Sequence, residues 1–238
     1  MSQTEPAVWY AIPSARPDGG TLRKWQEKGY KVAAFRDVRA EPLPWLNMVR
    51  HTLYEGYAKA VNLLCEDLLG CEALYGKIQI IVTGGDDVDP PDADPYEIQR
   101  GFVQHFPDLY GVMQPTGDRW MVDDQGRSAS ERVAYSPWMG REWVLRANGS
   151  RGPLWPEYYH FFVDEHLQCA ATMQGVFWQR PNLCQYHHWW GREGGKRPLH
   201  LVKTEAGERW REGKALFEAH QAHGFIESLP LPAATVSV

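Results

Sequence analysis

Three carboxylates follow a short apolar run of the chain within four positions. Residues 78–82 form the run, two glycines come next, and Asp86, Asp87 and Asp89 follow. Carboxylates this close together repel one another unless a cation lies among them. Their oxygens are the ligands that Mg²⁺ or Mn²⁺ prefers, and phosphate oxygens often complete the shell. The segment predicts either a metal and phosphate site or an acidic surface turn, because Asp, Gly and Pro also form turns.

A second acidic pair, Asp164 and Glu165, lies in an apolar and aromatic stretch. Burial raises the pKa of a carboxyl group and suits it to proton transfer. The alternative is structural, with one of the two capping a helix or pairing with an arginine. His187 and His188 follow further along the chain. Adjacent histidines project in different directions, so at most one of them is expected to bind a metal, and aromatic packing is the other interpretation.

These residues need elements that bring them together. Residues 78–82 are rich in β-branched side chains, the pattern of a strand buried on both faces. Residues 8–12 and 30–35 also predict strands, and a helix capped by Thr21 between them completes a βαβ unit. Ligands of open α/β sheets bind at the carboxyl ends of parallel strands. Arg16 and Asp37 follow the first two strands and are therefore expected at the same edge as Asp87.

Hydrophobic periodicity and turn residues predict the remaining elements. Helices are expected from Trp45 or Tyr54 to residue 69, over 95–105, from Pro156 through the acidic pair, over 167–175 and over 204–223. Short strands are expected at 110–114 and 176–178. A hairpin or loop at 118–130, loops at 146–153 and 191–197, and a tail at 229–238 are expected to connect or follow them.

Composition narrows the classes of protein. The chain has 238 residues, and its formal net charge of −5 argues against strong generic attraction to nucleic acid or anionic membranes. Its four cysteines lack zinc-site spacing and are expected to be reduced thiols of an intracellular protein. No signal peptide and no apolar run of the ~18–20 residues of a membrane span is apparent, so a cytoplasmic location without a membrane partner is expected.

The order of these motifs resembles the GT-A class of nucleotide-sugar glycosyltransferases, in particular the inverting family 2. The resemblance covers residues 7–200, and residues 152–160 and the tryptophan content are also similar to small bacteriophage-encoded members. It implies one α/β domain with a Rossmann-like, mixed and mainly parallel sheet flanked by helices. Residues 7–115 would form the nucleotide-sugar half, 116–200 the acceptor half, and 201–238 a C-terminal helix and tail.

The same resemblance implies roles for individual residues. The first nucleotide-binding loop would include Pro13, Ser14 and Arg16, and Asp37 would contact the base. Asp87 and Asp89 look like the Asp-x-Asp metal motif, which His187 or His188 would complete; the role of Asp86 at the donor stays open. Asp164 looks like the catalytic base because Leu167 has the usual spacing, with Glu165 as the alternative. Loop cations would assist the pyrophosphate and tryptophans would wall the sugar or acceptor; these are Arg151, Arg192, Lys196, Trp155 and Trp189.

The activity that the resemblance implies is metal-dependent inverting glycosyl transfer. The cofactor would be Mn²⁺ or Mg²⁺ and the donor a nucleotide-diphosphate sugar, with UDP as the expected nucleotide. Acceptors that it suggests are a hydroxylated base in phage DNA, a virion protein or a glycan, in the host cytoplasm. A nucleotidyltransferase is one alternative, although residues 13–20 lack the expected lysine. A non-catalytic carbohydrate- or protein-binding module is the other, and the sequence leaves the sugar, the acceptor and the oligomeric state open.

Overall fold

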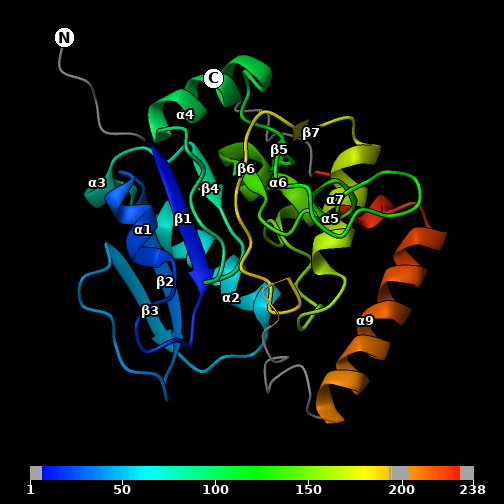
Figure 1. Cartoon of the computed structure of the whole chain (residues 1–238), viewed down its shortest axis with the longest axis horizontal. Helices are drawn as coiled ribbons and strands as arrows, with labels where there is room; N and C mark the ends of the chain where they lie inside the picture. Colours follow the sequence, from blue (N-terminus) through cyan, green and yellow to red (C-terminus); the bar gives the residue numbers. More distant parts are fainter. Residues whose placement is uncertain (1–6, 193, 195–203, 231–238) are drawn as a thin grey trace, which may run out of the picture.

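The chain folds as one α/β domain, in which a mixed seven-stranded sheet carries helices on both faces (Figure 1). The structure is a computed structural model that describes residues 7–192, 194 and 204–230. This architecture confirms the fold class predicted from the alternation of strands and helices. No helix in the described ranges combines the length and apolar character needed to cross a bilayer.

The strand order creates a switch point beside the first strand. The strands run in the order β3-β2-β1-β4-β6-β5-β7. They are β1 (Val8–Pro13), β2 (Lys31–Asp37), β3 (Met48–Thr52), β4 (Ile80–Val82), β5 (Val112–Pro115), β6 (Trp138–Gly140) and β7 (Phe177–Arg180). Strand β6 is antiparallel to β4 and β5, and the other pairs of described strands are parallel. The chain moves outward from β1 to β3 and then returns to the other side of β1 as β4. In open α/β sheets, ligands bind outside the carboxyl ends of the strands at such a reversal.

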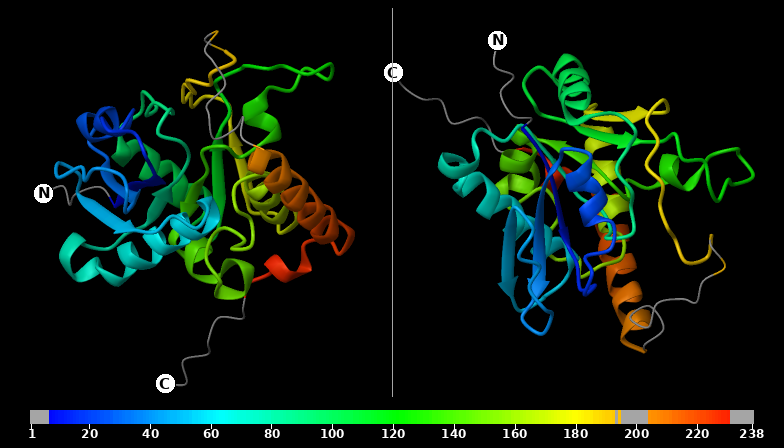
Figure 2. Two further views of the ribbon diagram at one scale, coloured as in Figure 1. Left: turned by 90° about the horizontal axis from the view of Figure 1, so that it is seen from below. Right: turned by 60° about the vertical axis from the view of Figure 1, so that its left-hand side comes forward.

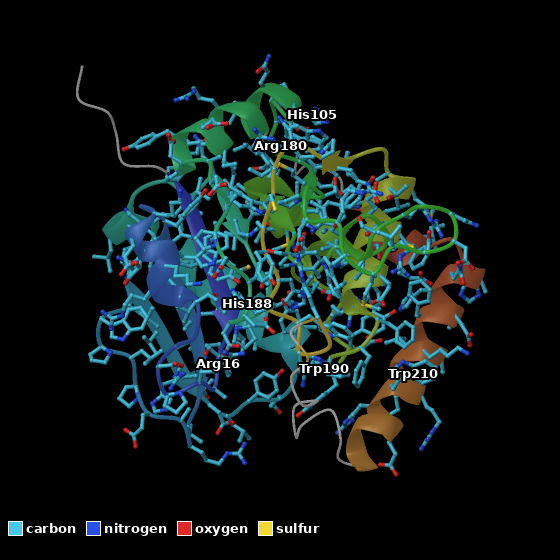
Figure 3. All side chains as sticks on the ribbon, viewed as in Figure 1. Arg16, His105, Arg180, His188, Trp190 and Trp210 are labelled. Carbon is cyan, nitrogen blue, oxygen red and sulfur yellow. The ribbon has the colours of Figure 1, made fainter. Side chains whose placement is uncertain are left out.

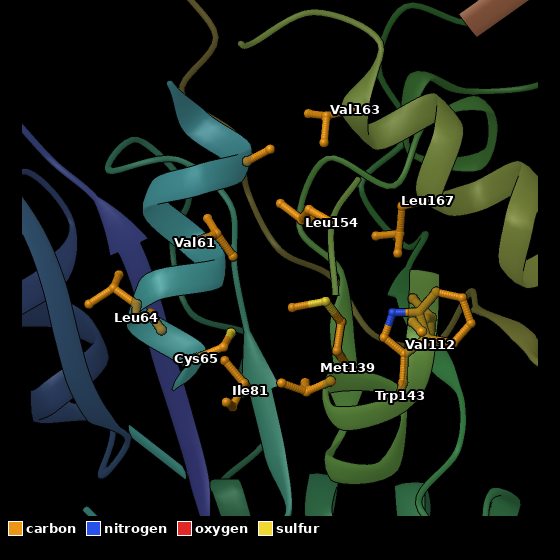
Figure 4. Close-up of a cluster of buried hydrophobic side chains, with 14 of the residues drawn as sticks. Val61, Leu64, Cys65, Ile81, Val112, Met139, Trp143, Leu154, Val163 and Leu167 are labelled. Atoms are coloured by element: carbon orange, nitrogen blue, oxygen red, sulfur yellow. The ribbon is translucent and has the colours of Figure 1, made fainter. Parts of the chain in front are cut away.

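Side chains of β1 alternate between two cores. Val8, Tyr10 and Ile12 pack with helices α1 (Leu22–Glu27) and α4 (Pro95–His105). Trp9 and Ala11 belong to the other cluster, with α2 (Tyr57–Gly70), α6 (Arg141–Ser150) and α7 (Val163–Met173). Successive strand residues point to opposite faces, so both faces of the sheet are covered. Figure 4 shows the second core, where side chains of α2 and α7 meet those of the sheet.

Helix α9 (Thr204–Ala222) packs against the segment that precedes α7 (Figure 1). A Cβ on Gly213 would lie 2.8 Å from the carbonyl oxygen of Phe161, so the two backbones approach closely there. Phe162 and Trp210 also pack together, with ring centroids 5.5 Å apart. The short elements are α3 (Glu72–Tyr75), α5 (Ala129–Arg132) and η1 (Ile226–Ser228).

Several predicted boundaries were wrong. The helix expected from Trp45 or Tyr54 begins at Tyr57, and the chain before it forms β3 on the outer edge of β2. The helix expected from Pro156 begins at Val163, because Phe162 has left-handed backbone angles (φ 68°) and interrupts any earlier turn; it is one helix to Met173, not two. The loop expected at 146–153 is partly helical, since α6 continues to Ser150 with a kink at residues 147–149.

The loop expected between β5 and α5 is present and projects from the body of the molecule (Figure 2). Asp123 closes its turn by accepting hydrogen bonds from the backbone of Gln125 and from both backbone and side chain of Arg127. Residues 231–238 of the tail predicted at 229–238, and residues 193 and 195–197 of the loop predicted at 191–197, lie outside the described residues.

Candidate active site

The loops that follow β1 and β4 are joined by Asp86. Ser14 Oγ donates a hydrogen bond of 2.7 Å to Asp86 Oδ2, and Arg16 Nε lies 3.0 Å from Asp86 Oδ1. The Asp86 carbonyl also accepts a hydrogen bond from Thr21 N, beside Gly20, where a Cβ would lie 2.1 Å from that oxygen. Burial raises the pKa of Asp86. The structure thus brings the predicted residues Pro13, Ser14 and Arg16 to the carboxylate segment at the switch point.

Arg36 holds the loop after β1 through backbone carbonyls, and the sequence did not identify it. Its side chain is fully buried, and it donates hydrogen bonds to the carbonyl oxygens of Ser14 (3.1 Å), Arg16 (2.8 Å) and Glu41. A guanidinium group can serve several carbonyls at once because its five donors are fixed in one plane. Its position as a charged residue near the end of an apolar strand is the signal that could have indicated this role.

The histidine segment pairs with the carboxylate segment along the backbone. Val88 and His187 form an antiparallel bridge, with His188 N donating to Asp87 O and Asp89 N donating to Tyr186 O. His187 Nε2 lies 3.5 Å from Asp87 Oδ1, and His188 Nε2 lies 2.9 Å from Asp89 Oδ2. Burial alone would raise the pKa of Asp87, but the hydrogen bond and charge of His187 lower it overall. Figure 3 shows Arg16, His188 and Trp190 at the end of the molecule toward which β1 runs.

Asp87, Asp89, His187 and His188 have the chemistry of a divalent-metal site. They lie in two separate pairs, Asp87 with His187 and Asp89 with His188. Carboxylates and imidazoles are ordinary ligands of Mn²⁺, so the donor types fit. Within the described ranges, however, no three His, Cys, Asp or Glu side chains converge as a metal-binding group. Asp89 is also held by Lys24. It lines an open pocket of about 350 Å³ with Lys24, Glu27, Lys28 and Pro90, on the side of α1.

Asp164 lies in the first turn of α7, directly after Val163. Its Oδ1 atom is buried and forms no hydrogen bond with any residue that the structure describes. Burial, reinforced by the nearby charge of Glu165, raises the pKa of Asp164 well above its usual value. Burial and the charge of Asp164 raise the pKa of Tyr57, whose hydroxyl donates to the carbonyl of Gly84 at 3.2 Å. Tyr57 therefore connects the environment of Asp164 with the loop that carries Asp86 and Asp87.

Burial also raises the pKa of Glu165. Its charge contributes to raising the pKa of Tyr158 and of Cys169, which burial raises first. Both of these residues belong to the core that α7 forms with the sheet. Of the two consecutive carboxylates, Asp164 is the one whose charge raises the pKa of Tyr57, and the Tyr57 hydroxyl donates to the loop after β4.

Asp118 is a second residue that sequence reasoning missed. It is 5% exposed, accepts a 2.6 Å hydrogen bond from Arg192 Nη1, and accepts one of 3.3 Å from His187 N. Arg192 also stacks on Tyr186, 3.9 Å from the ring centroid. Arg192 was predicted to assist the pyrophosphate, which stays a prediction; the structure places it beside the histidine segment. A polar, glycine-containing loop after a strand gave no signal that distinguished Asp118 from its neighbours.

Three predicted residues make other contacts. Arg151 pairs with Glu157 at 2.8 Å and lies over Trp155, which is 6% exposed within the core. The roles predicted for Arg151 at the pyrophosphate and for Trp155 at the sugar or acceptor stay predictions; Arg151 forms a surface ion pair with Glu157, and Trp155 packs in the core. Asp37 lies at the end of β2 as expected, but Arg39 and the backbone of Tyr54 occupy its oxygens and hold its pKa well below the usual range. Lys196 lies outside the described residues.

Comparison with known proteins adds little to this description. No protein-family model matches the chain, and no curated protein matches it. A197 from STIV shares 9% identity over 76% of this chain and 85% of its own, with a TM-score of 0.45. The 4-diphosphocytidyl-2C-methyl-D-erythritol synthase from Anaerococcus prevotii shares 9% identity over 58% of this chain and 72% of its own, with a TM-score of 0.30. Both TM-scores are low, so neither likeness bears on function.

Proposed function

We propose that the chain is a metal-dependent inverting glycosyltransferase with a nucleoside-diphosphate sugar as donor. One observation carries this proposal: the Oδ1 atom of Asp164 is buried and has no hydrogen-bond partner among the described residues. The charge of Asp164 acts on Tyr57, whose hydroxyl donates to Gly84 O in the loop after β4, at the switch point of an α/β sheet. Ligands of this fold class bind at that point. A carboxyl group whose pKa is raised by burial is suited to proton transfer.

The residues divide into a donor side and an acceptor side. Ser14, Arg16 and Asp86 form a connected wall at the ends of β1 and β4. Asp87 and Asp89, with His187 or His188, would hold the divalent ion, which when bound supplies positive charge to the diphosphate leaving group. Lys24 is an additional cation on this carboxylate segment.

Asp164 would act as the base on the acceptor side. Its carboxylate takes the proton of the acceptor hydroxyl as that oxygen forms a bond to the anomeric carbon. The bond from the anomeric carbon to the diphosphate oxygen breaks, and its electron pair leaves with the nucleoside diphosphate. Attack opposite to the leaving group inverts the anomeric configuration. Tyr57 would position Asp164 through their shared environment.

The first test is a thermal-shift series with UDP, with and without Mn²⁺, beside GDP and CDP. A ligand at about 100 times its dissociation constant stabilises a fold by about 2.7 kcal/mol, a readily measured shift. A shift that needs both a nucleoside diphosphate and the metal supports the proposal. No shift with any of these nucleotides would favour a binding module. A parallel series with UTP and CTP covers the alternative, because a shift with nucleoside triphosphates alone would favour a nucleotidyltransferase.

The second test separates the two acidic residues. Asp164→Asn should leave nucleotide binding near normal and reduce sugar transfer, or slow donor hydrolysis, by at least about a hundredfold, the range of general-base catalysis. Glu165→Gln should retain most of the activity, since the charge of Glu165 acts on Tyr158 and Cys169 of the α7 core. The opposite pattern would make Glu165 the base.

A further inference from the structure

Four aromatic rings from three separate segments gather beside Asp87. Trp120 follows β5, Tyr135 precedes β6, and His187 and Trp189 follow β7. Tyr135 stacks on His187 with centroids 5.0 Å apart and planes at 14°, and Trp120 lies 5.3 Å from His187 and 5.4 Å from Trp189. We call these four residues the aromatic cluster. Because His187 Nε2 lies 3.5 Å from Asp87 Oδ1, the cluster adjoins the carboxylate segment directly.

Hydrogen-bond donors and acceptors at this cluster are buried without partners. Trp120 Nε1, His187 Nδ1 and the neighbouring Trp190 Nε1 form no hydrogen bond with any residue that the structure describes. The tryptophans of the two cores differ from these, because their indole N–H groups have partners. Trp25 donates to Val88 O, Trp138 to Gln185 Oε1, and Trp143 to Pro153 O. Leaving a buried polar atom unpaired costs about 1–3 kcal/mol. Several such atoms at one place indicate groups that a ligand satisfies.

The surroundings hold the cluster in a fixed arrangement. Asp118 accepts hydrogen bonds from His187 N and Arg192 Nη1, and Tyr135 donates to the carbonyl oxygen of Gln185 at 3.1 Å. Trp189 folds back over Gly191, where a Cβ would lie 2.1 Å from its ring. These contacts position the cluster without using the indole N–H group of Trp120 or Trp190. A preorganised surface of this kind lowers the entropy that a ligand loses on binding.

We propose that the aromatic cluster, with Trp190, is the subsite for the sugar ring of the donor. This inference rests on the proposed function. Sugars present apolar C–H faces, which pack on aromatic rings, and hydroxyl oxygens, which accept hydrogen bonds from indole N–H groups. Ser14 and Arg16 contact Asp86, whereas the cluster contacts Asp87 through His187, so a diphosphate at Asp87 could have the nucleoside at the first loop and the sugar at the cluster.

The test compares binding of a nucleoside diphosphate with binding of its sugar conjugates. The wild-type chain and Trp120→Phe are titrated calorimetrically with UDP, UDP-glucose, UDP-galactose and UDP-N-acetylglucosamine, each with Mn²⁺. Trp120→Phe keeps an aromatic ring and removes the N–H, so we expect about fivefold weaker binding of the preferred conjugate, the effect of one hydrogen bond. Binding of UDP itself should stay within about twofold.

Trp210→Phe is the matched control, because Trp210 is 44% exposed on α9, away from the cluster (Figure 3). It should change neither affinity. If no conjugate binds more tightly than UDP, or if Trp120→Phe weakens UDP and conjugate equally, the subsite is not for the sugar, while the proposed function stands. Failure of the wild type to bind any nucleoside diphosphate would instead refute the proposed function itself.

Discussion

The ammonium group of Lys24 lies 2.7 Å from one carboxylate oxygen of Asp89 and 3.0 Å from the other. Lys24 thus forms an ion pair with Asp89, which we propose as a metal ligand. Lys24→Met should therefore tighten Mn²⁺ binding about two- to fivefold, the size of an exposed ion-pair interaction. The free energy of unfolding should change by less than about 1 kcal/mol, because the lysine side chain is 54% exposed.

Titration of Mn²⁺ followed by electron paramagnetic resonance measures this affinity without any turnover. Lys28→Met is the control, since Lys28 lies one turn further along and donates to the backbone carbonyl of Asp92. Equal affinities in the wild type and Lys24→Met would remove Asp89 from the metal site.

Asp164 should make the folded chain less stable as the pH rises. Its pKa is raised on folding, so the folded chain keeps this proton at pH values where the unfolded chain has lost it. The destabilisation is absent below about pH 4, the pKa of an unfolded aspartate, and grows as the pH rises through the folded pKa. Asp164→Asn should therefore have a higher Tm than the wild type at pH 7, with the difference shrinking toward pH 4.

Thermal unfolding of both proteins between pH 4 and pH 8 tests this relationship. Asp124→Asn, at an exposed position of the loop before α5, should show a difference that does not depend on pH. A constant or inverted difference for Asp164→Asn would mean that its carboxyl group is not desolvated in the folded chain.

Arg36 should be important for stability although it touches no expected substrate. Arg36→Leu leaves three carbonyl acceptors near the first loop without their donor, which should lower the free energy of unfolding by about 3 kcal/mol. Urea denaturation provides the measurement. Arg23→Leu, which removes an exposed guanidinium stacked on Trp45, should change the stability by less than about 1 kcal/mol. Similar losses in the two variants would contradict the role assigned to Arg36.

Two glycines of α9 should respond in opposite ways to alanine. Alanine normally stabilises a helix interior by about 1 kcal/mol relative to glycine, and Gly207→Ala should do so because its Cβ meets only Arg211 Nη1 at 3.9 Å. Gly213→Ala should instead destabilise the chain by about 1–3 kcal/mol, since its Cβ would approach Phe161 O to 2.8 Å. Comparison of the two Tm values decides the matter, and a gain at both positions would show that α9 does not pack on this segment.

The first half of the sheet could be predicted from the sequence, because its strands have a strong local pattern. Strand β4 and the alternation of β1, α1 and β2 carry apolar runs that are bounded by turn residues. Strand β3 was missed because its residues are half-buried or exposed, and it exists through pairing with β2. Strand β6 has three residues and depends in the same way on its neighbours β4 and β5.

At the site, motif order brought out the carboxylates and histidines, and the structure places these segments together. It could not reveal Arg36 or Asp118, because each acts through backbone groups of distant residues. The sequence also predicts that Trp155 walls the sugar or acceptor, and the structure shows Trp155 buried in the core. An aromatic residue near glycines and prolines has the same local pattern in a core as in a binding site.

The strand order has a consequence for the growing chain. The neighbours of β1 are β2, which follows it closely, and β4, which is synthesised only after β3 and α2. Until residues 80–82 emerge from the ribosome, one backbone edge of β1 has no partner from its own chain. Unpaired edges of apolar strands promote pairing between molecules. Fragments that end before β4 should therefore aggregate. Pairing of β4 with β1 covers this edge, and it also brings Asp86 to Ser14 and Arg16 in the proposed donor site.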